Sequence, residues 1–305
     1  MMKRWIKTFP IQGWLGLALI AVFWPLNWLG MGDRTHVGFF PLWLGYCLLM
    51  DGLVYIRKGD SMLQRDGRRY VGLFLLSIPM WWLFEALNLR LQNWQYVGKE
   101  EITGLEYALL ASLSFSTVIP AVLESAEFVG SFPIWGWLKQ GPKFDPRRGV
   151  EVIIFLGGWL GLVLLLIWPR YFFPLVWLSI YFILEPLNRW LGHRTLLSWT
   201  KKGDWRPLGA LWIGVLITAF FWEMWNYYSY PKWVYSIPFF DVLHVFEMPL
   251  LGYGGYLPFS LEIFAFTQLA FNLCGLALDD YLQLVEEGDE SSSPASTSSG
   301  SKNPL

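Results

Sequence analysis

The sequence predicts an all-α fold: a polytopic membrane helix bundle of about eight spans, built as two parallel internal repeats of four spans each. Three observations predict it. Hydrophobic residues make up 54% of the 305 positions and charged residues only 15%, with several apolar runs of about 20 residues, the length that crosses a bilayer. Segments of the first half recur in the second half. Basic residues concentrate in alternate loops, as in multi-pass proteins.

Internal repetition organises the whole chain. The run WLGLALIAVFWP at 14–25 recurs as WLGLVLLLIWP at 159–169, and FFPLWLGYCLLMDGL at 39–53 recurs as FFPLVWLSIYFILEPL at 172–187. Three polar positions recur at an offset of 138, which indicates a duplication rather than shared composition. They pair Glu85 with Glu223, Asn88 with Asn226, and Glu124 with Glu262.

The first repeat covers 1–149 and the second covers 150–287, while the acidic and Ser-rich tail at 288–305 is expected to be disordered. Segments 102–114 and 239–252 are predicted as interfacial or re-entrant half-helices. The alternative is one long, tilted or broken fourth span in each repeat. The predicted spans are 13–31, 37–56, 70–91 and 117–138, followed by 150–169, 171–190, 206–228 and 256–278.

The placement of Lys and Arg predicts the orientation in the membrane. Of the 23 basic residues, 18 fall in the N-terminal segment, three alternate loops and the C-terminal tail. The positive-inside rule assigns that side to the cytoplasm. We therefore expect an integral membrane protein with both termini cytoplasmic, and an even number of spans per repeat makes the repeats parallel.

Acidic side chains recur at membrane depth, where each costs about 2.5–3.5 kcal/mol at the bilayer centre. They are predicted to form two layers. Asp51 and Glu185 lie near the cytoplasmic ends of their spans. The other four are predicted at one depth, roughly 8–10 Å below the outer surface at 1.5 Å per helical residue. These are Glu85, Glu124, Glu223 and Glu262.

Each of these groups also has a structural explanation. Asp51 is close in sequence to Arg57, and Glu185 lies four residues before Arg189, so ion pairs would account for the inner layer. In the two Glu-x-x-Asn pairs the carboxylate and the amide share one helical face. Interhelical hydrogen bonds alone would account for those pairs.

The second repeat adds three polar groups, Asp241, His244 and Glu247. In a helix, His244 and Glu247 would share one face. His244 is either a structural residue or one that orients or relays a proton to Glu223 and Glu262. A di-metal carboxylate site needs Glu-x-x-His motifs on bundle helices, so we expect no metal.

Aromatic residues next to an acid, then a Trp about ten residues later, then Pro-x-x-x-Glu at the start of a span, appear once in each half. This order resembles the integral-membrane lycopene cyclases of the two-part or fused archaeal, fungal and actinobacterial type. In that family each half carries Trp-Asp, then His-Trp, then Pro-Leu-Glu-Glu. The matching residues here are Trp222-Glu223, Lys232-Trp233 and Pro258 to Glu262, with Phe84-Glu85, Asn93-Trp94 and Pro120 to Glu124 in the first half.

The chain departs from that pattern in four respects: Glu replaces Asp, the His is replaced, one carboxylate remains of each pair, and each half has an extra leading span. The resemblance covers about half of the chain. It implies protonation of a terminal double bond of a polyene in an apolar pocket, where aromatic faces shield the carbocation. Trp81 and Trp82 would join the tryptophans of the second half in that role.

We therefore predict a membrane-embedded isoprenoid- or carotenoid-type enzyme, cyclase-like, that works by acid–base chemistry in an aromatic pocket. The alternative is a multi-pass transporter or lipid-binding protein that uses the same carboxylates. The expected partners are membrane lipid and a hydrophobic polyene or lipid-like substrate, with no cofactor and no nucleic acid; the oligomeric state stays open. Candidate catalytic residues are Glu223, Glu262, Glu85, Glu124 and His244, and candidate substrate-binding residues are Asn226, Asn88, Trp222, Trp225, Trp233 and Glu247.

Overall fold

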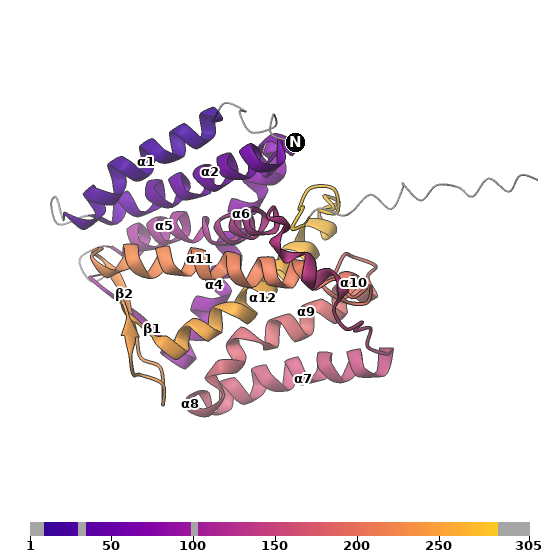
Figure 1. Cartoon of the computed structure of the whole chain (residues 1–305). Coiled ribbons are helices and arrows are strands. Elements are labelled where there is room, and N and C mark those ends of the chain that lie inside the picture. The colour runs from indigo at the N-terminus through magenta and orange to yellow at the C-terminus, as the bar shows by residue number, and fades with distance from the viewer. Residues whose placement is uncertain (1–8, 30–34, 99–102, 286–305) are drawn as a thin grey trace, which may run out of the picture.

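The computed structural model describes residues 9–29, 35–98 and 103–285, and the helices of these segments run side by side in one bundle (Figure 1). Seven helical segments of the described residues are long and apolar enough to cross a membrane. This confirms a helical, multi-pass membrane bundle. The predicted disordered tail at 288–305 lies outside the described residues.

In the first half, two helices form a hairpin and a long helix leads to a short strand. The elements in order are α1 (Ile11–Trp28), η1 (Thr35–Gly38), α2 (Phe39–Lys58), α3 (Met62–Arg65), α4 (Gly67–Leu91), β1 (Trp94–Val97), α5 (Gly104–Phe115) and α6 (Val118–Gly130).

The second half follows a similar course, with more irregular turns. Its elements are η3 (Pro133–Gln140), α7 (Arg148–Ile167), α8 (Pro169–Phe172), η4 (Phe173–Trp177), α9 (Ser179–Trp190), α10 (Leu197–Thr200), α11 (Arg206–Tyr227), β2 (Lys232–Tyr235), β3 (His244–Val245), β4 (Met248–Pro249), η5 (Leu250–Gly255) and α12 (Tyr256–Leu273).

The two flanks of the bundle are close-packed helix pairs, α1 with α2 and α7 with α9, and α4, α6, α11 and α12 lie between them (Figure 1). Glycines permit the close approach. A Cβ on Gly16 would stand 2.5 Å from the backbone N of Leu49, and one on Gly158 would stand 2.8 Å from the carbonyl O of Ser179. Small residues at such contacts are typical of helices that pack within a membrane.

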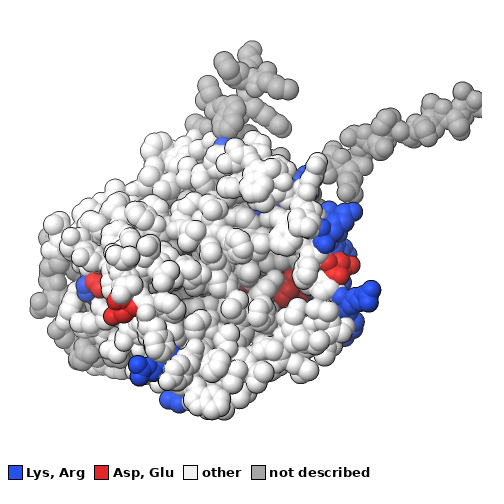
Figure 2. Space-filling view, turned by 60° about the horizontal axis from the view of Figure 1, so that its bottom comes forward, with Lys and Arg blue, Asp and Glu red and all other residues white. Residues whose placement is uncertain are grey.

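The two flanking helices α1 and α7 expose most of their apolar residues, with only 17% and 22% of their most apolar windows buried. On the face shown in Figure 2, charged side chains gather towards two opposite edges and largely uncharged surface lies between them. That distribution is expected of a surface in contact with lipid.

Two ends of the bundle are distinguished below. The ribbon end carries β1 and β2, and the short-helix end carries α3 and α10 (Figure 1). At the short-helix end, α4 begins at Asp66, whose side chain accepts hydrogen bonds from the backbone N–H groups of Arg68 and Arg69 as an N-cap. Gly59, at φ 89°, ends α2 just before α3.

The structure differs from the sequence-based expectation between the third and fourth spans. Residues 104–130 form one apolar segment broken only at Ser116 and Thr117, so the first half follows the broken-span alternative rather than a separate half-helix. Residues 239–252 are not α-helical: they contain the β3–β4 hairpin and the first residues of the 3₁₀ helix η5. Positive φ angles at Phe239, Leu243 and Phe246 interrupt any helix there.

The last predicted span, 256–278, corresponds to α12. This helix carries Glu262, Gln268 and Asn272, and it is not among the seven segments that satisfy the length and hydropathy criteria. Its residues 259–265 are nevertheless buried among the other helices. A helix in such a position does not need a continuous apolar surface, because its neighbours shield it from lipid.

Candidate functional site

The ribbon end is closed by an antiparallel pair of strands that joins the two halves of the chain. Trp94 of β1 stands opposite Tyr235 of β2, and Tyr96 stands opposite Trp233. The Trp-x-Tyr of each half thus pairs with the Trp-x-Tyr of the other half in reversed order. Side chains that recur in the two halves are brought together at one place.

Asn88 and Asn226 anchor these strands to α4 and α11. Asn88 donates from Nδ2 to the carbonyl O of Trp94 at 2.8 Å, and its Oδ1 accepts from the backbone N–H of Asn93 at 2.9 Å. Asn226 donates to the carbonyl O of Trp233 at 2.7 Å and accepts from its N–H at 2.9 Å. Both predicted substrate-binding amides are therefore engaged by backbone, and neither lines the cavity described below.

Glu85 is held near the end of α4 by three donors that converge on one oxygen. Its Oε1 accepts from the indole N–H of Trp81 at 3.0 Å, the indole N–H of Trp94 at 3.0 Å and the phenol of Tyr96 at 2.6 Å. Burial first, and then the charge of Glu85, raise the pKa of the Tyr96 phenol well above its usual range. The phenol therefore stays protonated and donates.

Glu223 occupies the corresponding place on α11 and is fully buried. Its Oε1 accepts from the phenols of Tyr235 at 2.7 Å and Tyr256 at 2.6 Å, while Oε2 has no hydrogen-bond partner among the described residues. Burial, and next the charge of Glu223, raise the pKa of Tyr235 well above its usual range, so this phenol also stays a donor. The donors are two phenols here and two indoles with one phenol at Glu85.

A cavity of about 550 Å³ lies between the two networks. Neither carboxylate lines it, but their donors do, with Trp81, Trp94 and Tyr96 on one side and Tyr235 and Tyr256 on the other. Each acid is thus one hydrogen bond away from the cavity. Phenols and indoles form the surface that a ligand would touch.

Aromatic rings make up much of the remaining wall. Trp177 of η4 stacks on Phe84 with ring centroids 5.4 Å apart and packs edge-on against Phe259 at the same separation. Trp222 lines the cavity and stacks on Tyr256 with centroids 6.0 Å apart. Such ring faces are suited to a long apolar molecule and to a developing positive charge.

The three predicted tryptophans of the second half separate in the structure. Trp222 and Trp233 line the cavity, as a substrate-binding role requires. Trp225 does not: it is buried in an aromatic cluster, 5.0 Å from Trp43 and 5.2 Å from Phe221 between ring centroids. Trp225 is therefore a packing residue between α2 and α11.

Glu124 does not share the depth of Glu85 and Glu223. Glu124 lies near the end of the 104–130 segment and interacts electrostatically with Asp51, Glu127 and Arg65. The sequence-based depth was counted from residue 117 and missed the helix that precedes it. Both Glu124 oxygens are buried without a hydrogen-bond partner.

Glu262 lies beside the first turn of α9, where the backbone N–H groups of Ile180 and Tyr181 face it, although neither oxygen forms a hydrogen bond. It does not contact the Glu223 network through any hydrogen bond of the described residues, and it does not line the cavity. The predicted pairing of Glu223 with Glu262 is absent from the described geometry.

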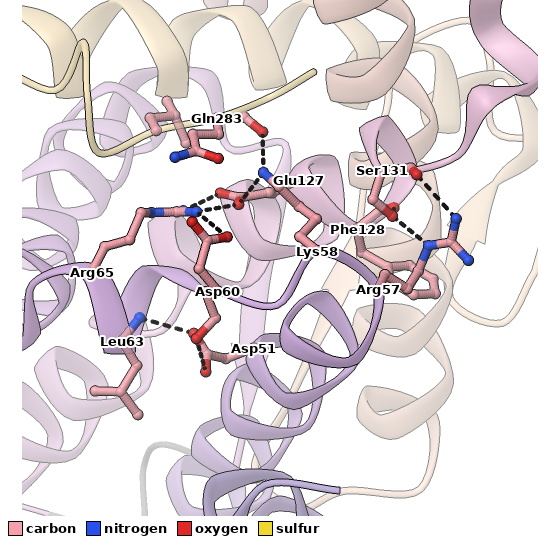
Figure 3. Close-up of polar contacts among 12 residues, drawn as sticks. Asp51, Arg57, Lys58, Asp60, Leu63, Arg65, Glu127, Phe128, Ser131 and Gln283 are labelled. Carbon is pink, nitrogen blue, oxygen red and sulfur yellow. Dashed lines mark hydrogen bonds and ion pairs between the residues drawn. The ribbon is translucent and has the colours of Figure 1, made fainter. Parts of the chain in front are cut away.

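The inner acids Asp51 and Glu185 cap short helices. Asp51 accepts from the Ser61 hydroxyl at 2.8 Å and from the backbone N–H of Leu63 at 2.9 Å (Figure 3). Glu185 accepts from the backbone N–H of Leu197 at 3.0 Å. Structural roles expected for both acids fit these contacts, although the partners are helix N-termini rather than the neighbouring Arg residues.

The cations near them are used by other acids. Arg65 donates two hydrogen bonds to the Glu127 carboxylate, at 2.8 and 2.6 Å, and Lys58 donates to the same carboxylate at 2.8 Å (Figure 3). Arg189 pairs with Glu151 at 2.8 Å. Glu127 and Glu151 had no assigned role in the sequence, because their partners lie far away along the chain.

His244 and Glu247 lie on the β3–β4 hairpin, and neither forms a described hydrogen bond or ion pair with Glu85 or Glu223. His244 is partly exposed and bonds to Asp241 at 2.8 Å, while Glu247 forms an ion pair with Lys232. No described contact links His244 to Glu223 or Glu262, so the structure does not bring this predicted relay together. Among the described residues there is no group of three His, Cys, Asp or Glu side chains that could hold a metal ion.

Three phenols of the site were not singled out from the sequence: Tyr96, Tyr235 and Tyr256. The repeated Trp-x-Tyr after each Glu-x-x-Asn was the available signal for Tyr96 and Tyr235, and nothing distinguishes Tyr256 from other interfacial tyrosines. Comparisons with family models, curated proteins and solved structures give no match to this chain.

Proposed function

We propose that this protein is a membrane-embedded enzyme that performs acid–base chemistry on an apolar, isoprenoid- or carotenoid-type substrate held in the aromatic cavity. One observation carries the proposal: Glu223 is buried behind Tyr235 and Tyr256, and both phenols line the cavity. A proton held by the carboxylic acid is thereby in reach of a ligand through a single phenol.

The proton transfer is written as a relay. In the described geometry both phenols donate to Glu223, so transfer begins when the acid is protonated and one phenol turns its hydrogen towards the cavity. Glu223 then gives its proton to the oxygen of that tyrosine while the tyrosine gives its own proton to a double bond of the substrate. This leaves a carboxylate behind the phenol and a carbocation in the cavity. Reversing the relay at a second position of the same ligand removes a proton and restores the acid, so no external reactant is consumed.

The wall supplies the other requirement of such chemistry. A carbocation must be kept from water and stabilised, and aromatic rings such as those of Trp222 and Trp177 line the cavity. The volume of about 550 Å³ falls in the range of small-molecule sites, roughly 300–1,000 Å³. It suits the reacting end of a long molecule, with the remainder in lipid.

Glu85 provides a second carboxylate on the other side of the same cavity. Its donors Trp94 and Tyr96 line the wall as the Glu223 donors do. Of the two first-half acids predicted as catalytic, Glu85 and Glu124, we assign the role that cooperates with Glu223 to Glu85. Glu262 and Glu124 lie outside the cavity wall and have no step in this scheme.

We infer in addition that the fold consists of two parallel repeats with cytoplasmic termini. Supporting contacts recur in both halves: each Asn of a Glu-x-x-Asn pair binds the strand that follows, and each inner acid accepts from a backbone N–H twelve residues later. Counting α12 as a span gives eight crossings, which returns the chain to its starting side.

The competing function is a transporter or a lipid-binding protein. A transport path would connect the ribbon end with the acids of the short-helix end. Among the described residues that line the cavity there is no Asp51, Glu124, Glu185 or Glu262. This favours a pocket that ends within the ribbon half of the bundle.

The test is expression in a host that accumulates an acyclic polyene, with extraction of the purified protein and the membranes and mass spectrometry of the isoprenoids. Wild type is expected to carry bound polyene and to convert it, while Glu223→Gln carries the polyene without conversion. Asp280→Asn is the control, an acid-to-amide change at an exposed residue that does not line the cavity. Wild type with bound polyene and no conversion would establish the lipid-binding alternative, and wild type with no bound isoprenoid would refute the proposal.

A further inference from the structure

The connection between β2 and α12 exposes an unusual number of large apolar side chains. We call residues 239–251 the hairpin segment; it contains β3, β4 and the start of η5. Leu243 is 75% exposed, and several of its neighbours are exposed as well. They are Phe239, Val242, Val245, Leu250 and Leu251. A patch of this kind on an otherwise ordered loop marks an interaction surface.

The opposite side of the hairpin segment faces the cavity. Met248 is buried and lines the cavity wall, whereas Phe240 and Leu251 line the wall and are also exposed, so the two sides of the segment meet at these residues. Phe240 also packs against Phe173 of η4, with ring centroids 6.2 Å apart. The segment is therefore a single layer of chain with the cavity on one side and the exposed apolar patch on the other.

The neighbourhood of the patch is that of a bilayer interface. Phe239 stacks on Tyr171 of α8 at 6.0 Å between centroids, and the guanidinium of Arg170 lies 5.4 Å from the Phe239 ring. Trp168 and Tyr171 are both exposed at the end of α7, whose long apolar face is exposed as well. Trp, Tyr and Arg at the end of a spanning helix mark the headgroup level.

Ordered contacts hold the segment in this position. Glu247 forms an ion pair with Lys232 of β2, and the phenol of Tyr253 donates to the carbonyl O of Val245 at 3.2 Å. Leu243 and Phe246 adopt positive φ angles of 56° and 57°, which bulky residues rarely do. These contacts fix a conformation in which Leu243 points away from the protein.

We propose that the hairpin segment 239–251 is an interfacial membrane element, whose exposed apolar side chains contact the acyl chains of the lipid leaflet at the ribbon end. The partner is lipid rather than a second protein because the patch joins the exposed apolar face of α7 through the stack of Phe239 on Tyr171. Asp241 and His244, which bond to each other, lie among these residues and can remain at the headgroup level.

The position of the hairpin segment also affects how a ligand reaches the cavity. The cavity is separated from lipid by the thickness of one segment, so an apolar ligand has a route from the leaflet that does not cross water. The location of the segment does not depend on what the cavity binds.

The experiment places an environment-sensitive nitrobenzoxadiazole probe on a single cysteine in phosphatidylcholine nanodiscs. Cys274 is exposed and is first replaced in a Cys274→Ser background, while Cys47 is buried. The test position is Leu243→Cys. Ile153→Cys on the exposed face of α7 is the lipid control, and Lys202→Cys at the short-helix end is the aqueous control.

The probe at Leu243 is expected to be quenched by lipids that carry a nitroxide near the headgroup at least about twofold more strongly than the Lys202 probe. Aqueous iodide should quench it less than the Lys202 probe. Quenching by iodide equal to that of the aqueous control, with no lipid quenching, would overturn the proposal. Val242→Cys repeats the measurement if Leu243→Cys does not fold, and neither result depends on a substrate.

Discussion

The acids at the short-helix end and Glu223 at the ribbon end are all buried, while Glu85 is partly buried, and the two ends differ in what their acids bind. Asp51, Glu127 and Glu185 accept from backbone N–H groups or from the cations Lys58 and Arg65. Those donors belong to the ends and loops of helices. The acids there stabilise the turns that connect the spans.

Glu85 and Glu223 instead accept from phenols and indoles. The donors are side chains that continue into the wall of the cavity, so the charge state of the acid affects what a ligand meets. Burial alone therefore does not separate a structural acid from a candidate catalytic one, whereas the surroundings of its donors do.

Replacement of Glu127 should have the largest effect on stability. Glu127→Gln removes the charge that holds Lys58 and Arg65, and breaking a buried ion pair on one side costs about 3–5 kcal/mol. Thermal unfolding in detergent measures the loss.

Asp280→Asn is the matched control for that measurement. Asp280 pairs with Arg69 at 2.8 Å but is exposed, and surface pairs contribute about 0–1 kcal/mol. Equal destabilisation by the two variants would show that the Glu127 cluster does not behave as a buried one.

The phenols at the ribbon end should matter for turnover and not for folding. Tyr256→Phe removes a 2.6 Å hydrogen bond to Glu223 and the hydroxyl that faces the cavity, while Tyr235 still donates to the acid. Loss of a proton-transferring group is expected to lower turnover by about 10²-fold or more. Polyene conversion and thermal unfolding are measured on the same preparations.

Tyr253→Phe serves as the control for Tyr256→Phe, since the Tyr253 phenol donates to a backbone carbonyl of the hairpin segment. Turnover that falls equally in both variants would indicate a general effect of lost hydroxyls rather than a relay through Tyr256.

Removal of the Asp51 carboxylate should give an intermediate loss of stability. Asp51→Ala leaves the Ser61 hydroxyl and the Leu63 N–H without their acceptor, at a cost of about 1–3 kcal/mol. Polyene conversion per folded molecule should not change. If the variant kept its stability but lost conversion, Asp51 would have a functional role, and the transporter alternative would be supported.

Glu262→Gln should have the smallest effect. Both carboxylate oxygens are buried without a hydrogen bond, so the amide removes an uncompensated acid and unfolding is expected at an equal or higher temperature. Conversion should stay within a few-fold of wild type by the same reasoning. A large loss of conversion with unchanged stability would support the catalytic role predicted for Glu262.

The spans, the recurrence of the Glu-x-x-Asn pairs and the aromatic character of the site could be predicted because each is a local pattern with a fixed period or offset. Depth could not be predicted in the same way. The depth of Glu124 was counted from residue 117, whereas the apolar segment that carries it begins at Gly104 and is interrupted only at Ser116 and Thr117.

The partners of the buried acids were also beyond local patterns. Glu127 meets Arg65 across 62 residues, and Glu223 meets Tyr256 across 33. His244 illustrates the opposite error: the helical spacing of His244 and Glu247 suggested one face, but positive φ angles at Leu243 and Phe246 turn the segment into a hairpin. Such backbone geometry is set by packing and not by the spacing of residue types.

In the proposed relay, Glu223 passes a proton to the ligand through the phenols at the cavity wall. Its most direct measurement is turnover in D₂O followed by mass spectrometry of the product. Because the relay returns a substrate proton to Glu223, the protein is first equilibrated in D₂O and limited to a single turnover. Wild type is then expected to place one deuteron in each product molecule, and Glu223→Gln is expected to form no labelled product while still binding polyene. A product that forms without deuterium, or deuterium incorporation that persists in Glu223→Gln, would contradict the relay.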